Sequence, residues 1–203
     1  MAPDLIGALI DATVNSMAVH ADELTQLDQA IGDGDHGTNM QRGFDAIEAA
    51  AEEISALDLG AARQKAGMTL VTTVGGASGP PYGSLLMSMG KAASSEPTGR
   101  ASFAAVFSEG VDAVKRRGKS DVGAKTMLDV LVPVLEALRS NDGDAVPAAR
   151  KAADEGLEST RNMLATKGRA SFLGERSVGH LDPGARSSAL LVHVVCDLIE
   201  ESP

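Results

Sequence analysis

The pattern of apolar and polar positions along the chain predicts a protein built from helices. Apolar residues recur every three or four positions from about residue 3 to 20 and again from about 183 to 201, which is the period of an amphipathic helix. Between these ends, the same period predicts helices near residues 38 to 54, 59 to 74, 80 to 95, 100 to 117, 125 to 140 and 144 to 167. Strand-like runs are scarce. We therefore expect an all-α fold of about eight amphipathic helices.

Proline and glycine mark the boundaries of several helices. Pro133 falls inside an otherwise regular apolar pattern, so a kink or a helix start is expected near it. Residues 141 to 144 read as a turn followed by a helix cap, with Pro147 in the first turn of the next helix. Nothing repeats at a fixed period and no low-complexity linker divides the chain, so we expect residues 1–203 to form a single domain.

Composition and charge narrow the classes of function. The net charge of -10 and the isoelectric point near 4.8 argue against binding nucleic acid through its backbone, which requires clustered Lys and Arg. Aromatic residues make up only 2% of the chain while small residues abound, which favours closely packed helices. The chain contains no apolar run near the roughly 18 residues of a membrane span and no basic leader. A single cysteine, Cys196, has apolar neighbours and is expected to be buried. We expect a cytoplasmic protein that binds neither membrane nor nucleic acid.

Three loops contain more glycine and polar residues than a helix connection needs: residues 28–39, 75–83 and 168–184. The first resembles the G-x-G-x-x-G phosphate loop between Gly32 and Gly37, but no β-branched strand precedes it, which argues against a dinucleotide fold. A calcium loop counted from Asp33 would have Gly37 at its fifth position and Phe44 at its twelfth, where an acid is required. The sequence GKS at residues 118 to 120 lacks the strand and first glycine of a Walker A loop, so it is read as a helix end.

Three aspartates make the first loop a candidate metal site. Asp28, Asp33 and Asp35 offer hard oxygen ligands, which suit magnesium or calcium better than zinc. A cation between this loop and a phosphate would neutralise both, and this explains how an acidic loop can serve an anionic ligand. The alternative is a solvated acidic turn that caps a helix.

The other two loops offer groups suited to an anion. In residues 75 to 83, small residues ahead of a helix expose backbone N–H groups and Ser78 adds a hydroxyl, although a plain Gly-Pro turn is equally compatible. In residues 168 to 184, Arg169 is a candidate phosphate clamp, whereas Arg176 and Arg186 can equally be surface charges. His36 is expected to touch phosphate or metal; His20 and His193, on helices, are expected to be structural or exposed.

Four segments in order along the chain closely resemble the nucleotide-binding L subunit of dihydroxyacetone kinase: residues 28–40 (DQAIGDGDHGTNM), 75–80 (GGASGP), 168–171 (GRAS) and 174–184 (GERSVGHLDPG). The resemblance covers nearly the whole chain. It implies a barrel of eight antiparallel helices, with a nucleotide and two magnesium ions bound among the loops at one end. Pro81 departs from the pattern, since a larger apolar residue is usual there.

The resemblance also implies the site residues. Asp28, Asp33 and Asp35 match the magnesium ligands. The positions that match nucleotide contacts are His36, Gly37, Thr38, Asn39, Ala77, Ser78, Arg169, Asp182, Pro183 and Gly184, with Met127 on the adenine side and Gly118 as a less secure match.

The chemistry implied is phosphoryl transfer, which needs positioning and charge neutralisation more than a protein nucleophile, and none is evident. The family's sugar-binding K domain is missing from these residues, so a K-subunit partner is implied. In the phosphotransferase-system type, bound ADP is a coenzyme that a phosphohistidine on an M subunit converts to ATP, whose γ-phosphoryl group passes to dihydroxyacetone. The alternatives are a kinase with exchangeable ATP acting on another small keto-sugar, and a magnesium-nucleotide module that regulates a transcription factor.

Overall fold

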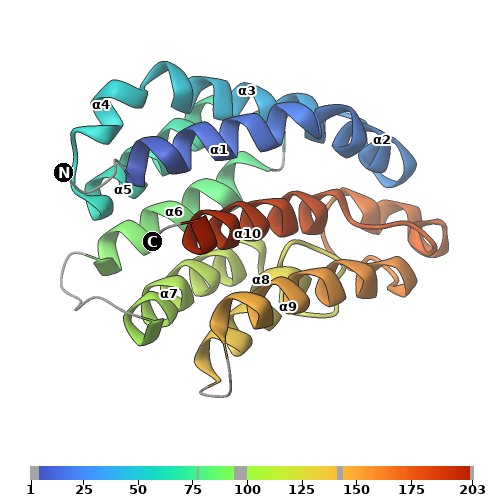
Figure 1. Ribbon diagram of the computed structural model, residues 1–203. Coiled ribbons are helices and arrows are strands. Elements are labelled where there is room, and N and C mark those ends of the chain that lie inside the picture. Colours follow the sequence, from blue (N-terminus) through green and yellow to red (C-terminus); the bar gives the residue numbers. More distant parts are fainter. Residues whose placement is uncertain (1–4, 77, 94–99, 141–143, 202–203) are drawn as a thin grey trace.

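The computed structural model describes residues 5–76, 78–93, 100–140 and 144–201, which are helical over most of their length (Figure 1). The elements in chain order are α1 (Leu5–Val19), α2 (Ala21–Ile31), α3 (His36–Ala49), α4 (Ala51–Ser55), α5 (Leu59–Thr73), α6 (Gly79–Ala92), α7 (Arg100–Gly118), α8 (Leu128–Arg139), α9 (Ala145–Ser159), the 3-10 helices η2 (Thr160–Asn162) and η3 (Arg169–Ser177), and α10 (Pro183–Glu201). The all-α prediction is confirmed, and the described residues contain no strand.

The elements differ from the predicted ranges at four places. Helix α2 was not among the predicted helices, because its stripe of Leu24, Asp28 and Ile31 includes a buried acid that interrupts the apolar period. The predicted helix at 38–54 divides into α3 and α4, and the one at 144–167 ends as α9 and η2. Pro133 lies inside α8 and does not start it, because the helix begins at Leu128.

Eight of these helices close into a ring. In order around the ring each contacts the next: α1, α3, α5, α6, α7, α8, α9 and α10, which returns to α1. Helix α2 connects α1 to α3, and α4 packs against α1 and α5. The ring encloses one large apolar core contributed by these helices, including Met17, Leu70 and Val130. The chain therefore forms the eight-helix barrel that the resemblance implied.

Small residues let neighbouring helices of the ring approach closely. A Cβ atom added at Gly83 of α6 would lie 2.7 Å from the carbonyl oxygen of Gly67 on α5, and one at Gly67 would lie 2.9 Å from that of Gly83. Such distances are shorter than van der Waals contact, so side chains larger than glycine are excluded there. The low aromatic content and the abundance of small residues are explained by this packing.

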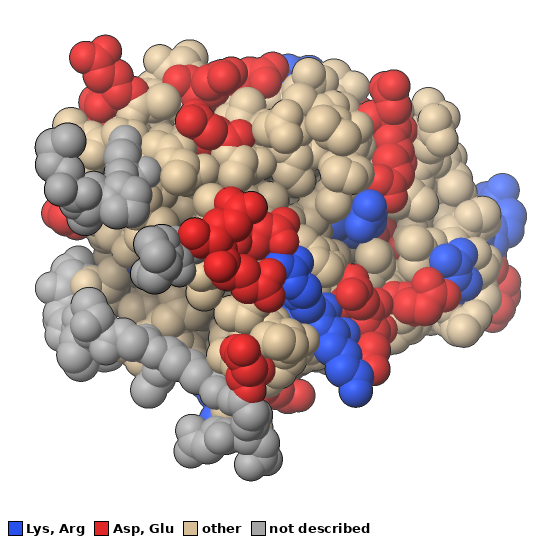
Figure 2. All heavy atoms as spheres, in the orientation of Figure 1, with Lys and Arg blue, Asp and Glu red and all other residues tan. Residues whose placement is uncertain are grey.

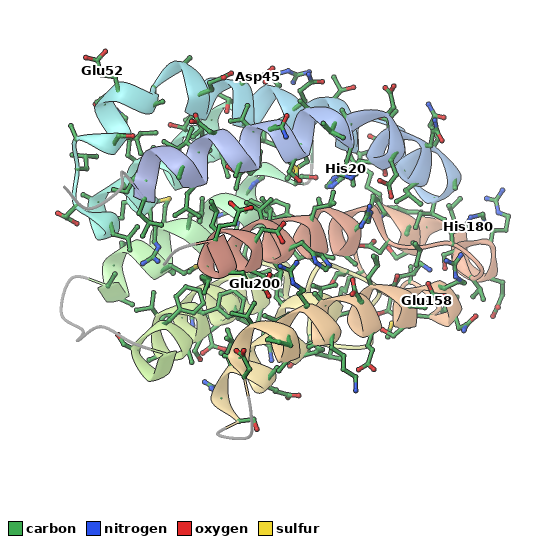
Figure 3. All side chains as sticks on the ribbon, in the orientation of Figure 1. His20, Asp45, Glu52, Glu158, His180 and Glu200 are labelled. Carbon is green, nitrogen blue, oxygen red and sulfur yellow. The ribbon has the colours of Figure 1, made fainter. Side chains whose placement is uncertain are left out.

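Alternate connections of the ring bring the glycine-rich loops to one end. The links α2–α3, α5–α6, α7–α8 and α9–α10 share that end, because successive helices of the ring run in opposite directions. Figure 3 shows His180 and Glu158 at this end, near α2, and Glu52 at the opposite end. We call the first the loop end. The three loops selected from the sequence meet there.

Acidic residues outnumber basic ones in the chain, 28 to 18. Figure 2 shows Asp and Glu side chains in several separate patches on the face that carries α1, α9 and α10, with fewer Lys and Arg, in keeping with the net charge of -10. No helix within the described residues has the length and apolar character needed to cross a membrane. Cys196 is buried as expected, and burial raises the pKa of its thiol.

Candidate metal and anion site

The three aspartates of the first loop converge at the loop end. One carboxylate oxygen from each of Asp28, Asp33 and Asp35 lies within 4.8 Å of the others. Asp28 is buried near the end of α2, Asp35 is half-buried, and Asp33 is exposed. Three carboxylate oxygens at this spacing suit a hard divalent cation. Because the cluster extends from the interior to the surface, such a cation could also bind a ligand from the solvent side.

The buried Asp28 carboxylate belongs to the acidic cluster and also holds the backbone of the loop in place through hydrogen bonds. Its Oδ2 atom accepts hydrogen bonds from the backbone N–H groups of Asp35, at 2.8 Å, and His36, at 3.1 Å. These are orphan donors at the start of α3, so the Asp28 carboxylate satisfies the helix end while its other oxygen faces Gly32. The predicted alternative of a helix cap is thus partly realised, by the same residue that belongs to the acidic cluster.

Each glycine of the G-x-G-x-x-G pattern is required by a different local contact or backbone angle. A Cβ atom at Gly32 would lie 1.9 Å from Asp28 Oδ1, and Gly34 has a φ of 75° that side chains disfavour. A Cβ atom at Gly37 would lie 1.9 Å from the carbonyl oxygen of Ala21, so this glycine lets α3 pack against α2. The pattern here builds a carboxylate cluster and a close helix contact.

His36 is buried at the start of α3 and joins three elements. Its Nδ1 atom lies 2.7 Å from Ser78 Oγ, ahead of α6, and its Nε2 atom lies 2.9 Å from Ser187 Oγ, on α10. Burial lowers the pKa of His36 despite the nearby carboxylates of Asp28 and Asp35, which raise it. A neutral imidazole is therefore favoured, and because both ring nitrogens bond serine hydroxyls, the contact of His36 with phosphate or metal stays a prediction.

Asn39 presents an unused donor beside the second loop. Its Oδ1 atom accepts from Arg42 Nη1 at 3.1 Å, whereas its Nδ2 atom is buried without a hydrogen-bond partner. Buried amide donors are usually satisfied, so this group is suited to an acceptor supplied by a ligand. A Cβ atom added at Gly76, whose φ is 64°, would lie 3.1 Å from Asn39 Nδ2 and 3.3 Å from Asp35 Oδ2. The glycine loop therefore runs directly over the carboxylate cluster.

The long third loop is ordered and reaches the first. Residues 169–177 form η3, and Leu173 packs on a small cluster of Ile31, Ala165 and Ala170, whereas Phe172 is 89% exposed. Arg169 Nη1 lies 2.9 Å from Asp33 Oδ2, so the candidate phosphate clamp pairs with a candidate metal ligand. The sequence left the roles of two other arginines open: Arg186 pairs with Glu23 at 2.6 Å, and Arg176 is exposed.

Met127, expected on the adenine side, lies beside the expected nucleotide contacts Asp182, Pro183 and Gly184 where α8 and α10 begin. A Cβ atom at Gly184 would lie 3.7 Å from the backbone nitrogen of Met127 and 3.0 Å from Asp182 Oδ2. Asp182 is buried and caps α10 by accepting from the Ala185 N–H at 2.7 Å. Burial raises the pKa of the Asp182 carboxyl to about 7. Pro183 is buried beside it in the first turn of α10.

The remaining predicted residues are distributed as follows. Gly37 is buried and Thr38 is exposed on the first turn of α3. Gly118 ends α7, with its position open enough that an added Cβ atom would meet only Ser120 Cβ at 3.5 Å. Ala77 lies outside the described residues. Pro81 falls in the first turn of α6, where proline is well tolerated. His20 bonds the Ser16 carbonyl, and His193 pairs with Asp154, in keeping with structural roles.

Sequence reasoning missed a buried polar group beneath the third loop. The Lys125 side chain is only 1% exposed, and its Nζ atom donates to the carbonyl oxygens of Thr160, at 2.6 Å, and His180, at 2.5 Å. Burial lowers the pKa of Lys125, while Asp182 and Asp129 favour its charged form. Buried Asp129 accepts from the Gly123 and Thr126 N–H groups. The signal available was two charged residues, Lys125 and Asp129, within an apolar helical pattern.

The fold and the site together define a helical-barrel protein that gathers carboxylates and anion-binding groups at one end. The DAK2 domain model matches residues 30–197. The ADP-binding subunit DhaL of PEP-dependent dihydroxyacetone kinase 1 from Listeria innocua is 50% identical over 174 residues, covering 85% of this chain and 84% of that one. The corresponding DhaL subunit of Escherichia coli is 40% identical over 185 residues, covering 88% of each chain. The chain belongs to the DhaL family of DAK2-domain proteins.

A solved structure supports the fold. The crystal structure of the dihydroxyacetone kinase from C. freundii in complex with AMP-PNP and Mg2+ superposes with a TM-score of 0.79 at 23% identity. It matches 98% of this chain, but this chain spans only 34% of that one. The helical barrel thus corresponds to about a third of that longer kinase.

Proposed function

We propose that this chain is the nucleotide-binding subunit of a phosphotransferase-system-dependent dihydroxyacetone kinase. It holds ADP or ATP at the loop end through two Mg2+ ions and passes the γ-phosphoryl group to dihydroxyacetone bound on a separate K subunit. The observation that carries the proposal is the convergence of Asp28, Asp33 and Asp35 within 4.8 Å, beneath the glycine loop. The relatives that match over most of their length are named as ADP-binding subunits, which agrees with a stand-alone barrel.

The residues present fit such a ligand. The three carboxylates would hold the magnesium ions, which when bound supply the positive charge that offsets the phosphates. The unpaired Asn39 Nδ2 donor lies across the glycine loop from the Asp35 carboxylate, and the Ser78 hydroxyl bonds His36 at the start of α3; both can donate to phosphate oxygens. Arg169 can move from Asp33 to a phosphate oxygen, since its side chain is 53% exposed. Residues 36 to 39 and Ser78 would thus surround the phosphates, and Ala77 remains an expected contact from the resemblance alone.

The base and ribose would lie at the neighbouring junction of α8 and α10. Met127 offers an apolar contact for adenine, with Gly118 at the end of the preceding helix α7, while Asp182, Pro183 and Gly184 form the wall on the side of α10. Phosphoryl transfer requires the reacting oxygens to be held in line and shielded from bulk water. The barrel supplies the nucleotide side of that arrangement, and the partner supplies the sugar side.

The proposal includes protein partners. A K subunit would present dihydroxyacetone, a phosphohistidine carrier, the M subunit, would regenerate ATP on the protein, and a transcription regulator is a further partner. These contacts belong at the loop end, because the phosphoryl group must be reached there. The lone buried cysteine is in keeping with a reducing compartment such as the cytoplasm.

The first test is to purify the protein without added nucleotide, denature it and assay the supernatant for adenine nucleotide and magnesium. About one ADP per chain surviving purification would support a bound coenzyme, because a ligand retained through dilution must dissociate slowly. A site that fills only with added magnesium-ATP would instead favour a kinase with exchangeable nucleotide. The absence of binding under any condition would reject the proposal.

The second test asks whether the acidic loop is needed for nucleotide binding and phosphoryl transfer. Asp33→Asn should abolish phosphoryl transfer to dihydroxyacetone on a K subunit and weaken magnesium-ADP binding, with helical circular dichroism retained. Asp45→Asn is the matched control, because Asp45 is an exposed acid on α3 beyond the loop (Figure 3). Equal losses in both variants would show that general surface charge, and not the cluster, is responsible. A protein that binds nucleotide but supports no transfer would be a regulatory module.

A further inference from the structure

Phe172 is the most exposed large apolar side chain among the described residues, at 89%. It lies on η3, in the connection of α9 to α10 at the loop end (Figure 1). The chain has four phenylalanines, one tyrosine and no tryptophan, and all of these rings except Phe172 lie in the core or pack against it. Single exposed apolar residues are common on protein surfaces, so exposure alone does not indicate an interface.

The geometry of η3 holds the Phe172 side chain outward. A 3-10 helix has three residues per turn, so side chains three positions apart lie along one edge. Ala170 and Leu173 form the inner edge, which belongs to the small apolar cluster of the third loop. Arg169 and Phe172 form a second edge, which is exposed. Both pairs precede the break in helical geometry at Gly174, so Phe172 cannot turn inward without unpacking the inner edge.

The exposed edge of η3 starts at the carboxylate cluster. Arg169 lies one turn before Phe172, and its Nη1 atom lies 2.9 Å from Asp33 Oδ2. One turn of a 3-10 helix rises about 6 Å, so Phe172 stands close to the proposed phosphate site on its outer side. A protein that covers the phosphates from the solvent side is therefore placed to contact this ring.

Further exposed apolar side chains lie on segments that are bonded to the third loop. They are Val122, Leu164 and Val178. The Thr166 N–H donates to the Ala124 carbonyl at 3.2 Å, and the Ala165 N–H donates to Ser177 Oγ at 3.0 Å. The connections α7–α8 and α9–α10 therefore present apolar side chains on adjoining segments. We call Phe172 and these three residues the apolar rim.

Residues 167 to 176 are basic, in contrast to the chain as a whole. Lys167, Arg169 and Arg176 stand there against Glu175, whereas the net charge of the chain is -10. Lys167 and Arg176 are exposed and form no ion pair within the part of the chain that the structure describes. A partner with an apolar pocket and acidic groups at its edge would complement both the apolar rim and these charges.

The chemistry of the proposed function indicates which partner this is. Transfer of a phosphoryl group to a sugar hydroxyl competes with transfer to water, so the protein that brings the sugar must displace water from the phosphates. An aromatic ring beside the phosphates favours such closure, because its burial removes apolar surface from water. When ATP is regenerated, the acceptor is ADP that the barrel already holds, so selection against water as an acceptor falls mainly on the sugar step.

We propose that Phe172 anchors the K subunit, with its ring entering an apolar pocket that has acidic groups at its edge. This inference rests on the proposed function, because it takes the partner that carries dihydroxyacetone as the occupant of the apolar rim. Phe172 contacts the partner and not the reacting atoms, so it contributes to association and not to the chemical step.

The test is single-turnover transfer to dihydroxyacetone from the full chain loaded with magnesium-ATP, at increasing concentrations of its K subunit. Phe172→Ala should raise the K-subunit concentration for the half-maximal rate about ten- to a hundredfold, the range for truncation of an aromatic anchor. The maximal rate should change less than about twofold, as expected for an effect on binding alone. Phe172→Leu should recover most of the affinity. Ile199→Ala is the control and should have no effect, because Ile199 is an exposed apolar residue near the other end of α10.

Other measurements on the same variant exclude rival roles. Magnesium-ADP affinity should be unchanged in Phe172→Ala, and a matching loss there would make Phe172 a nucleotide contact and overturn the inference. An unchanged dependence on the K subunit would also overturn it, as would a defect confined to rephosphorylation of bound ADP by the M subunit. In each of these cases an active wild type leaves the proposed function intact.

Failure of the proposed function has a different signature. If the wild-type chain supports no transfer with the K subunit, the proposed function fails before any variant is compared, and the assignment of the apolar rim fails with it. The acidic edge of the pocket is tested separately: the double variant Lys167→Gln and Arg176→Gln should make K-subunit binding less sensitive to salt. Unchanged sensitivity would overturn that part of the inference.

Discussion

The Nη1 atom of Arg169 lies 2.9 Å from the Oδ2 atom of Asp33, so an ion pair joins the third loop to the acidic loop. The guanidinium occupies the outer side of the carboxylate cluster, where a divalent cation would also be attracted. Arg169 and a metal therefore compete for the same carboxylate. We therefore expect Arg169 to weaken the binding of magnesium alone and to strengthen the binding of magnesium-ADP.

Replacing Arg169 with Gln should strengthen magnesium binding in the absence of nucleotide and weaken the binding of magnesium-ADP. The gain for magnesium should be about two- to fivefold, because both partners are partly exposed and such pairs contribute less than about 1 kcal/mol. Titration calorimetry with each ligand measures the effects. Arg176→Gln, an exposed arginine of the same loop, is the control. Loss of affinity for both ligands would exclude the competition.

Substitutions of Asp28 and Asp33 should differ in their effect on the free energy of unfolding. Asp28→Asn should lower the free energy of unfolding by about 1–3 kcal/mol as well as weaken metal binding, because the buried carboxylate accepts two backbone N–H groups. Asp33→Asn should weaken metal binding but change the free energy of unfolding by less than about 1 kcal/mol, because the Asp33 side chain is exposed. Urea unfolding of the metal-free proteins compares them. Equal stability losses would contradict the separate roles.

Lys125 should stabilise the loop end through its two carbonyl contacts. Lys125→Met should lower the free energy of unfolding by about 1–3 kcal/mol, because the Thr160 and His180 carbonyls lose their donor. Lys119→Met is the matched control: both lysines have positive φ, 46° at Lys119 and 60° at Lys125, but Lys119 is exposed. An equal effect at both positions would assign the loss to backbone strain.

Asp182 should make the protein less stable as the pH rises from about 4 to about 7. Its folded pKa is raised to about 7 from the ordinary value of 3.8, chiefly by burial, so the folded state binds the proton more tightly. Stability is therefore greatest below the ordinary value and declines until the pH passes the folded pKa. Lys125 and Asp129 face this carboxyl and act on its pKa in opposite directions, with Lys125 lowering it and Asp129 raising it.

The Asp182→Asn variant isolates this contribution. Within the window, the stability of the wild type should fall relative to the variant by up to about 1.4 kcal/mol per pH unit, the slope for one proton. Denaturant unfolding of both proteins between pH 4.5 and 7.5 gives the difference. Parallel curves would show that Asp182 is ionised throughout.

The fold class and most helices follow from periodicity, because an amphipathic stripe is a local property that each helix carries in its own sequence. Helix α2 escaped this reasoning because Asp28 occupies a buried position on it. An aspartate in a sequence is expected to face solvent unless its hydrogen-bond partners are known. The partners of Asp28 are the backbone N–H groups of Asp35 and His36, which lie at the start of the next helix, α3.

The acidic loop and its three aspartates could likewise be selected from the sequence, because they lie within eight positions of one another. Only the tertiary structure decided what else reaches them. The ring of helices brings Ser78, Arg169 and Ser187 from distant segments to the same end. Contacts such as Tyr82 to Ser187, 105 residues apart, depend on how helices pack and leave no periodic trace in the sequence. Local patterns thus determined the elements and their chemistry, whereas packing at the loop end decided which side chains act together.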